Sequence, residues 1–292
     1  MLTHLNSSVQ LYYASLELLE DKNFSAKILD WLSAEEQKRY QRFVSKQQAQ
    51  QYLLARALLR SQLSNRVRYV LPCEWTFVVD DYGKPKLADE FSNLDLHFNL
   101  SHSEDLVVLA LGKGSGKGSG KGLGRGLGRG LGRGLNLGVD VESIHRPVFS
   151  MALAKRYFAT SELADLMKMT EQQQIKRIAQ LWTLKESYLK ANGVGLRVPL
   201  SKLAFSFKGQ GDLELSASSS LAETLTVEKG SSIALFCLWS DYSVALTIDT
   251  DKAIDISAVT INEWFGLNEQ TSCLSWKLLR TTESQSFSRD LL

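Results

Sequence analysis

Cysteine is scarce in this chain: there are three cysteines among 292 residues. Cys73, Cys237 and Cys273 lie far apart, and their spacing matches no metal-binding motif, which excludes the usual cysteine-held metal sites. A small, odd number of cysteines indicates a reducing compartment rather than a framework of disulfides.

Long apolar runs and targeting signals are also missing. No apolar run approaches the length of a membrane span, and the first residues do not form a basic segment followed by an apolar one. No Gly-Lys pair continues into Ser or Thr as a nucleotide-binding P-loop requires. We therefore expect a cytoplasmic protein without a membrane partner, and a phosphate site, if present, of another kind.

The chain does have enough apolar surface for a core, since 44% of its residues are hydrophobic and 9% aromatic. Its length suits one large or two ordinary domains. The formal net charge of +2 hides an asymmetry, because residues 112–136 hold six basic residues and no acid. The remainder has 28 basic residues against 32 acidic ones, so it is mildly acidic.

Residues 112–136 form a repeat in which glycine occupies every even position from Gly112 to Gly134, with lysine, arginine, serine and leucine between. Such glycine density predicts a flexible loop. Because the repeat joins expected strands at 105–111 and 137–142, we interpret it as an insertion in a hairpin. Its charge could attract nucleic acid or an acidic protein, but a tolerated repeat expansion explains it as well.

The segment Gly138-Val139-Asp140-Val141-Glu142 predicts a short strand that buries its valines. Asp140 and Glu142 then share a face, and two neighbouring carboxylates favour a cation between them, for which oxygen ligands indicate Mg²⁺. The alternative is a half-buried strand with a solvated acidic face.

A long helix is expected at 172–192, closed by Gly193. Glu186 and Lys190 are four residues apart and share a face of it, as in a metal-and-phosphate site or an ordinary surface salt bridge.

Other candidates lie earlier in the chain. Arg56 and Arg60 share a face of a helix expected at 46–63, either as a solvated face or as an anion site. Lys84 lies in a turn between Gly83 and Pro85, aimed at a phosphate or simply at the surface. The run of polar side chains that ends an expected strand at 97–103 also suits a phosphate, although a lone histidine there is often structural; its members are Asn99, Ser101, His102 and Ser103.

The remaining pattern alternates helices and strands. A first strand is expected at 11–19, a helix from a capping box at Ser33 and Glu36, and a second from Ser45 and Gln48. Further strands are expected at 74–80, 203–207, 213–216, 233–240 and 242–248, and helices near 148–158 and after a cap at Thr160 or Ser161. The last two strands predict a hairpin turning at Ser240-Asp241, and the tail from Ile254 is expected to pack Trp264 and Trp276 on the body.

In order, Phe98–Ser103, Gly138–Glu142 and Trp182–Lys190 resemble the Sfp-type 4′-phosphopantetheinyl transferases. The Tyr82-Gly83-Lys84-Pro85 turn and the helix around Arg56 also lie where that family has them. The resemblance covers roughly residues 8–250, and three motifs in this order are specific.

The resemblance implies an α+β fold of two similar halves related by a pseudo-twofold axis, each a small antiparallel sheet packed with helices, with coenzyme A between them. The expected segments are an N-terminal half (1–111), a flexible Gly/Lys/Arg-rich insertion (112–136), a C-terminal half (137–250) and an extension (251–292). It also implies a monomer that modifies acyl or peptidyl carrier protein domains. We expect neither a nucleic-acid nor a membrane partner.

The family also implies roles for individual residues. Asp140, Glu142 and Glu186 would hold Mg²⁺ against the pyrophosphate of coenzyme A, and Glu186 would be the general base. Lys190 would neutralise or protonate the leaving phosphate. Arg56, Lys84 and His102 would bind phosphates, and His102 would also have a catalytic role. Gly83 and Pro85 would shape the turn that carries Lys84. Asn99 and Ser101 would line the nucleotide pocket.

The chain departs from the family pattern at the glycine repeat, which replaces a short link, and near Glu36, where the family's basic residues are only partly reproduced. Two alternatives of other classes use the same scaffold: an inactive coenzyme A-binding regulator, and an RNA-binding protein that uses the basic repeat. The three acids argue against both, because binding without chemistry does not require crowded carboxylates.

Overall fold

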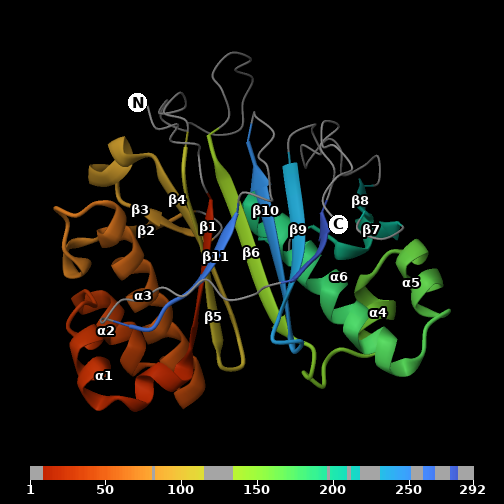
Figure 1. Cartoon of the computed structure of the whole chain (residues 1–292), viewed down its shortest axis with the longest axis horizontal. Coiled ribbons are helices and arrows are strands. Elements are labelled where there is room, and N and C mark those ends of the chain that lie inside the picture. The colour runs from red at the N-terminus through yellow and green to blue at the C-terminus, as the bar shows by residue number, and fades with distance from the viewer. Residues whose placement is uncertain are drawn as a thin grey trace. The chain divides into compact units, whose positions relative to one another are not determined.

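Two long helices, each packed on a mainly antiparallel sheet, organise the computed structural model of this chain (Figure 1). The structure describes residues 9–80, 83–114, 134–195, 198–208, 212–217, 231–250, 259–266 and 277–281. The chain divides into unit 1, residues 1–119 and 259–275, and unit 2, residues 120–258 and 276–292.

Unit 1 is built around helix α3 (Lys46–Arg66) and a sheet with strand order β11-β1-β5-β4. Its elements are β1 (Gln10–Ser15), α1 (Lys22–Leu29), α2 (Ala34–Gln41), α3, β2 (Phe77–Val79), β3 (Pro85–Leu87), β4 (Leu96–Ser103), β5 (Leu106–Lys113) and β11 (Thr260–Glu263). Apolar side chains of α3 such as Leu54 and Leu58 share one core with Val107 and Leu109 of β5. Burial of this apolar face of α3 therefore holds the helix against the sheet.

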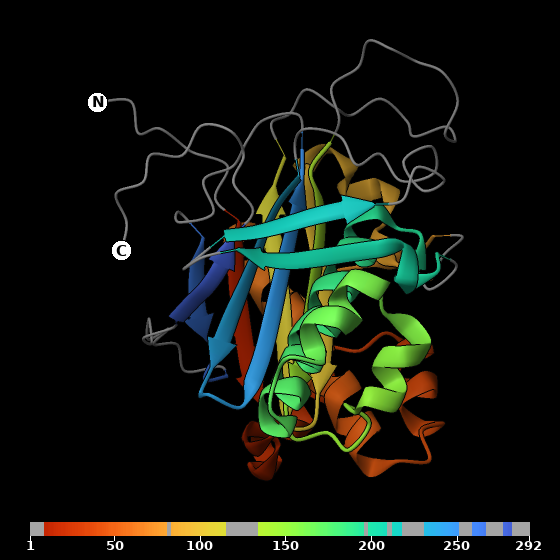
Figure 2. The same cartoon turned by 90° about the vertical axis from the view of Figure 1, so that its right-hand side faces the viewer.

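Unit 2 is built around helix α6 (Glu171–Asn192) and a sheet with strand order β6-β10-β9-β12-β8-β7. Its elements are β6 (Asn136–Ser143), α4 (Met151–Tyr157), α5 (Thr160–Leu166), α6, β7 (Leu203–Lys208), β8 (Asp212–Ala217), β9 (Ser231–Leu238), β10 (Tyr242–Asp249) and β12 (Lys277–Thr281). Leu184 and Tyr188 of α6 share a core with Leu235 and Ala245 of the sheet, and Figure 2 shows α6 lying along that sheet.

The two units follow the same order of elements: a strand, short helices, a long helix, a pair of short strands, and a hairpin. In each, the second hairpin strand pairs with the first strand of the unit, giving β1-β5-β4 and β6-β10-β9. The predicted α+β class, with small sheets packed by helices, is confirmed.

Several predicted helix ends and one predicted turn are confirmed. Ser33 and Glu36 form the predicted capping box of α2, and the Ser45 side chain caps α3. Gly193 closes α6 with a φ of +63°. The hairpin of β9 and β10 turns through Ser240 and Asp241 as predicted.

Several predicted boundaries are wrong. The first strand ends at Ser15, because the Ser15 side chain accepts a hydrogen bond from the Glu17 amide and begins a 3-10 helix, Leu16–Glu20. The strand predicted at 74–80 is confined to β2, since Pro72–Glu74 is another 3-10 helix. Helix α5 is capped at Ala159, one residue before the predicted cap.

The hairpin predicted around the glycine repeat is also wrong, because β5 pairs with β1 and β4 whereas β6 pairs with β10 in another sheet. Residues 115–133 of the repeat lie outside the described residues.

The C-terminal part supplies strands to both sheets. β11 pairs in parallel with β1, and β12 pairs with β9. Trp264 is 1% exposed, with its ring centroid 5.8 Å from that of Phe24, so its predicted packing is confirmed; Trp276 lies outside the described residues. The four segments predicted with limits at 111, 136 and 250 stay a prediction. Among the described helices, none combines the length and apolarity needed to cross a membrane.

Candidate active site

The acidic strand β6 turns its carboxylates toward helix α6. A Cβ atom at Gly138 would lie 1.9 Å from the Ser187 carbonyl oxygen and 2.4 Å from the Ala191 nitrogen, so this position faces the helix backbone. Asp140 and Glu142 follow at the same alternation and share that face. They are 4% and 8% exposed, so the alternative of a solvated acidic face is wrong.

Helix α6 contributes Glu186 and Lys190 to the same place. The Lys190 ammonium donates to Asp140 Oδ1 at 2.6 Å and to the Val139 carbonyl at 3.1 Å. This ion pair joins helix to strand, so Lys190 serves the acidic strand rather than an exposed surface pair on its own helix.

Arg146 is a site residue that the sequence reasoning missed. Its Nη1 donates to Glu142 Oε2 at 2.5 Å, and its guanidinium lies 5.8 Å from the Phe149 ring centroid. The available signal was a basic residue four positions after Glu142, next to Pro147. The structure thus neutralises two buried carboxylates with two of the chain's own cations.

Glu186 has an unusual carboxyl group. Burial raises the pKa of Glu186 to about 7, and the charge of Asp140 adds to the effect, while Lys190 opposes it. Its Oε1 atom is buried and has no hydrogen-bond partner among the residues the structure describes. Glu186 can therefore take up or release a proton near neutral pH, and it has an oxygen available to a ligand.

The acidic residues of this site have the chemistry of a cation site. Asp140, Glu142 and Glu186 supply carboxylate oxygens, the ligands that Mg²⁺ prefers, and Glu186 presents a buried oxygen that needs a partner. As they stand, no three Asp, Glu, His or Cys side chains within the described ranges are gathered as a metal site. The residue types fit, and Lys190 and Arg146 each contact one of the acids.

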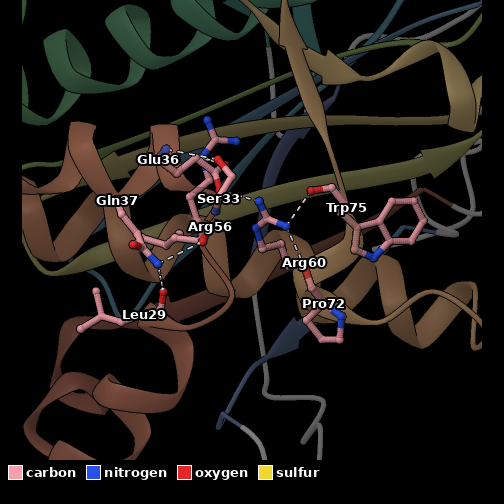
Figure 3. Close-up of polar contacts among 9 residues, drawn as sticks. Leu29, Ser33, Glu36, Gln37, Arg56, Arg60, Pro72 and Trp75 are labelled. Atoms are coloured by element: carbon pink, nitrogen blue, oxygen red, sulfur yellow. Dashed lines mark hydrogen bonds and ion pairs between the residues drawn. The ribbon is translucent and has the colours of Figure 1, made fainter.

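Arg56 and Arg60 in unit 1 are buried, at 9% and 1% exposed, so the expected solvated face is wrong. Both guanidiniums contact the Glu36 carboxylate, Arg56 Nε at 3.2 Å from Oε1 and Arg60 through Nη2 (Figure 3). Arg56 also lies 5.2 Å from the Phe77 ring centroid, and its Nη1 has no partner within the described part of the chain. Arg56 therefore retains a buried donor that could meet an anion.

The turn that carries Lys84 is built by Asp80. The Asp80 carboxylate accepts from the Lys84 amide at 2.9 Å, and the Asp80 amide donates to the Lys84 carbonyl at 3.0 Å. Gly83 supplies the φ of +84° that the turn needs, and Pro85 begins β3. The neighbouring Tyr82 lies outside the described residues.

Strand β4 carries the other polar candidates. Asn99 and Ser101 are buried, at 6% and 7% exposed, and His102 is exposed. The structure thus brings together the acids and Lys190 in unit 2, and it places the phosphate-binding candidates in unit 1.

Comparison with known proteins assigns the family. The family model "4'-phosphopantetheinyl transferase superfamily" matches residues 136–247, and "4'-phosphopantetheinyl transferase, N-terminal" matches residues 20–113. The 4'-phosphopantetheinyl transferase HetI of Nostoc sp. is 31% identical over 196 residues, 67% of this chain and 73% of the relative. The chain belongs to the Sfp-type 4′-phosphopantetheinyl transferases.

The transferase also resembles the 4'-phosphopantetheinyl transferase Sfp of Bacillus subtilis, with 28% identity over 81% of this chain and 94% of the relative. Among solved structures, the match to the holo-[acyl-carrier-protein] synthase from Neisseria meningitidis covers 40% of this chain and 98% of that protein, with a TM-score of 0.35 and 21% identity. The protein is therefore an enzyme that transfers phosphopantetheine to carrier proteins, as its family and relatives do.

Proposed function

We propose that the transferase moves the 4′-phosphopantetheine arm of coenzyme A to a serine of an acyl or peptidyl carrier protein in a Mg²⁺-dependent reaction. The observation that carries the proposal is the carboxyl pKa of Glu186. Burial, together with the negative charges of Asp140 and Glu142, raises this pKa to about 7. A carboxylate of this pKa suits a general base at neutral pH.

In the proposed reaction Glu186 accepts the proton of the carrier serine. The serine oxygen forms a bond to the β-phosphorus that bears pantetheine, and the bond from that phosphorus to the bridging oxygen breaks. Adenosine 3′,5′-bisphosphate leaves with the bonding electrons. The Lys190 ammonium, oriented by Asp140 Oδ1 at 2.6 Å, offsets the charge that develops on the leaving phosphate.

Asp140, Glu142 and Glu186 would hold the magnesium ion. A bound Mg²⁺ neutralises charge on phosphate oxygens, which is its usual contribution to phosphoryl chemistry. The carboxylates of the chain would orient the ion, and Lys190 and Arg146 would balance the remaining negative charge.

The residues of unit 1 would bind the donor. Arg56 offers a buried Nη1 donor, and the constrained turn of Gly83 and Pro85 presents Lys84. We propose that these two cations and His102 bind the phosphates of coenzyme A, with Asn99 and Ser101 of β4 beside the nucleotide. A cytoplasmic monomer is the proposed working form.

The test is a panel of apo acyl and peptidyl carrier proteins incubated with coenzyme A and Mg²⁺. Mass spectrometry should show one phosphopantetheine arm added to at least one carrier, and the Glu186→Gln variant should lose nearly all of this rate. Glu171→Gln, an exposed change at the start of the same helix, is the matched control and should retain it. A full rate in Glu186→Gln, or no mass gain on any carrier, would reject the proposal.

A further inference from the structure

Lys185, the residue before Glu186 on α6, is completely buried. An ammonium has three N–H donors, and each meets an acceptor: Glu162 Oε2 at 2.7 Å, the Leu200 carbonyl at 2.8 Å and the Leu203 carbonyl. The long helix is thereby bonded to α5 and to the start of β7.

The partner carboxylate is also fully used. Glu162 is 3% exposed, and besides Lys185 it accepts from the Ala159 amide at 2.9 Å and from the Phe205 amide at 2.9 Å. We call Lys185, Glu162 and these backbone partners the Lys185–Glu162 lock. A buried charge pair with its hydrogen bonds complete permits one arrangement of the elements that carry it.

The same device occurs in unit 1. Arg60 follows the first residue of α3 by 14 positions, as Lys185 follows the first residue of α6. Arg60 pairs with Glu36, the third residue of α2, as Lys185 pairs with Glu162, the third residue of α5. Each glutamate accepts from the amide of its helix cap, Ser33 or Ala159.

The backbone partners correspond as well. Arg60 Nη1 donates to the Pro72 carbonyl at 2.8 Å and the Trp75 carbonyl at 2.7 Å, at the two ends of a 3-10 helix (Figure 3). Lys185 donates to the carbonyls of Leu200 and Leu203, at the two ends of another. Both units therefore fix the long helix with one buried cation.

The residues that follow the buried cation differ between the two units. Glu186 follows Lys185, whereas Ser61 follows Arg60. In the pairing of first strand with second hairpin strand, Glu142 lies opposite Ser243 and the corresponding Ala14 lies opposite Val107. A buried cation–glutamate pair thus holds the long helix in both units, with an acidic site beside it in unit 2.

We propose that Lys185 and Glu162 are positioning residues that set the rotation and height of α6, so that Glu186 faces Asp140 and Glu142. Successive helical residues differ by about 100° in direction. Fixing Lys185 toward α5 and β7 therefore fixes Glu186 toward β6. The inference rests on the proposed function, in which Glu186 is a cation ligand.

The test compares two charge-neutral double variants, Lys185→Met with Glu162→Gln, and Arg60→Met with Glu36→Gln. Removing both charges avoids leaving one buried ion without its partner. Three properties are measured for each variant. Calorimetric titration with Mn²⁺ or Mg²⁺ in the absence of coenzyme A gives the cation affinity, and thermal unfolding gives the stability. Steady-state kinetics give kcat and the KM for coenzyme A.

We expect the unit 2 double variant to bind the cation about tenfold or more weakly and to lose kcat by a similar factor, as removal of groups that orient metal ligands does. Its KM for coenzyme A should stay within about twofold, because the substitutions do not remove contacts that bind the substrate and the transition state equally. The unit 1 double variant should keep the cation affinity of the wild type and instead change KM, because Glu36 also orients Arg56.

If the unit 2 double variant does not fold, Glu162→Asp, which keeps both charges and shortens the reach of the carboxylate, takes its place with the same expectation. Wild-type cation affinity in a folded unit 2 variant, or an equal loss in the unit 1 variant, would overturn the inference. Failure of the wild type itself to bind a cation or transfer the arm would instead reject the proposed function.

Discussion

Glu186 lies largely out of water beside two other carboxylates, and both conditions oppose its negative charge. Its pKa of about 7 exceeds the usual 4.5, so the folded protein favours the protonated form. The stabilisation from this group is fully present below pH 4.5 and is lost as pH rises through 7.

We therefore expect the metal-free wild type to lose roughly 3 kcal/mol of unfolding free energy between pH 4.5 and 8 from this group. Glu186→Gln, which carries no charge at any pH, should show a flatter curve and should be the more stable protein at pH 8. Urea unfolding at several pH values, with Glu171→Gln as control, measures this. Parallel curves for Glu186→Gln and wild type would contradict the pKa assignment.

At this scale the sequence predicted what alternation and helical spacing determine: the shared face of Asp140 and Glu142, and that of Glu186 and Lys190. It did not predict that Arg56 and Arg60 are buried. Their partner Glu36 lies in another helix, and spacing within one helix carries no information about a charge brought there by tertiary packing.

Among the elements, β6 and α6 approach so closely at Gly138 that a methyl group there would overlap the helix backbone at both Ser187 and Ala191. The glycine is required by this approach rather than by its φ. Because backbone atoms cannot rotate aside, any added side chain must push the helix away from the acidic strand.

Gly138→Ala should therefore destabilise the protein by about 1–3 kcal/mol or more, as overpacking does, and should weaken cation binding through displacement of Glu186. Gly193→Ala is the comparison, since Gly193 has a φ of +63° and nothing within 4 Å of an added Cβ. It should cost about 1–2 kcal/mol through backbone strain with a smaller effect on cation binding. Denaturant unfolding and calorimetric titration separate the two; equal cation affinities would contradict the close-approach argument.

Element ends were predictable where the signal is local, as with the Ser33 side chain that caps α2 and the left-handed backbone of Gly193 that ends α6. Strand pairing was not, because pairing joins distant residues. The expected hairpin of β5 and β6 failed for this reason: the two strands are consecutive along the chain, yet each pairs within a different sheet.

The whole molecule is not built from two continuous stretches of chain. Unit 1 receives β11 after the chain has formed β6 to β10 of unit 2. β11 pairs with β1 from Gln10 to Tyr13, the Trp264 amide donates to the Tyr13 carbonyl at 2.9 Å, and the Trp264 side chain enters the core beside Phe24.

We expect Trp264→Ala to destabilise unit 1 by about 3–5 kcal/mol, as removal of a buried aromatic does. Trp239→Ala, at a side chain 49% exposed on the β9–β10 turn, should change stability by no more than about 0.5 kcal/mol. Hydrogen exchange should show faster exchange of β1 amides in the first variant only. Unchanged β1 protection in Trp264→Ala would show that the tail does not support unit 1.

The sequence predicted only that the tail packs its tryptophans on the body. A four-residue strand with weak alternation does not indicate which strand it pairs with. The burial of Trp264 followed from its apolar size, whereas its place in the first sheet depends on contacts some 250 positions apart.

The late return of the chain to unit 1 has a consequence for biosynthesis. A ribosome delivers the helices α1 to α3 and three strands of the first sheet long before it delivers β11, so one edge of β1 remains open during translation of the entire middle of the chain. During this period the nascent N-terminal region would be the part most in need of chaperone protection. That region would become resistant to protease only once Trp264 has left the exit tunnel.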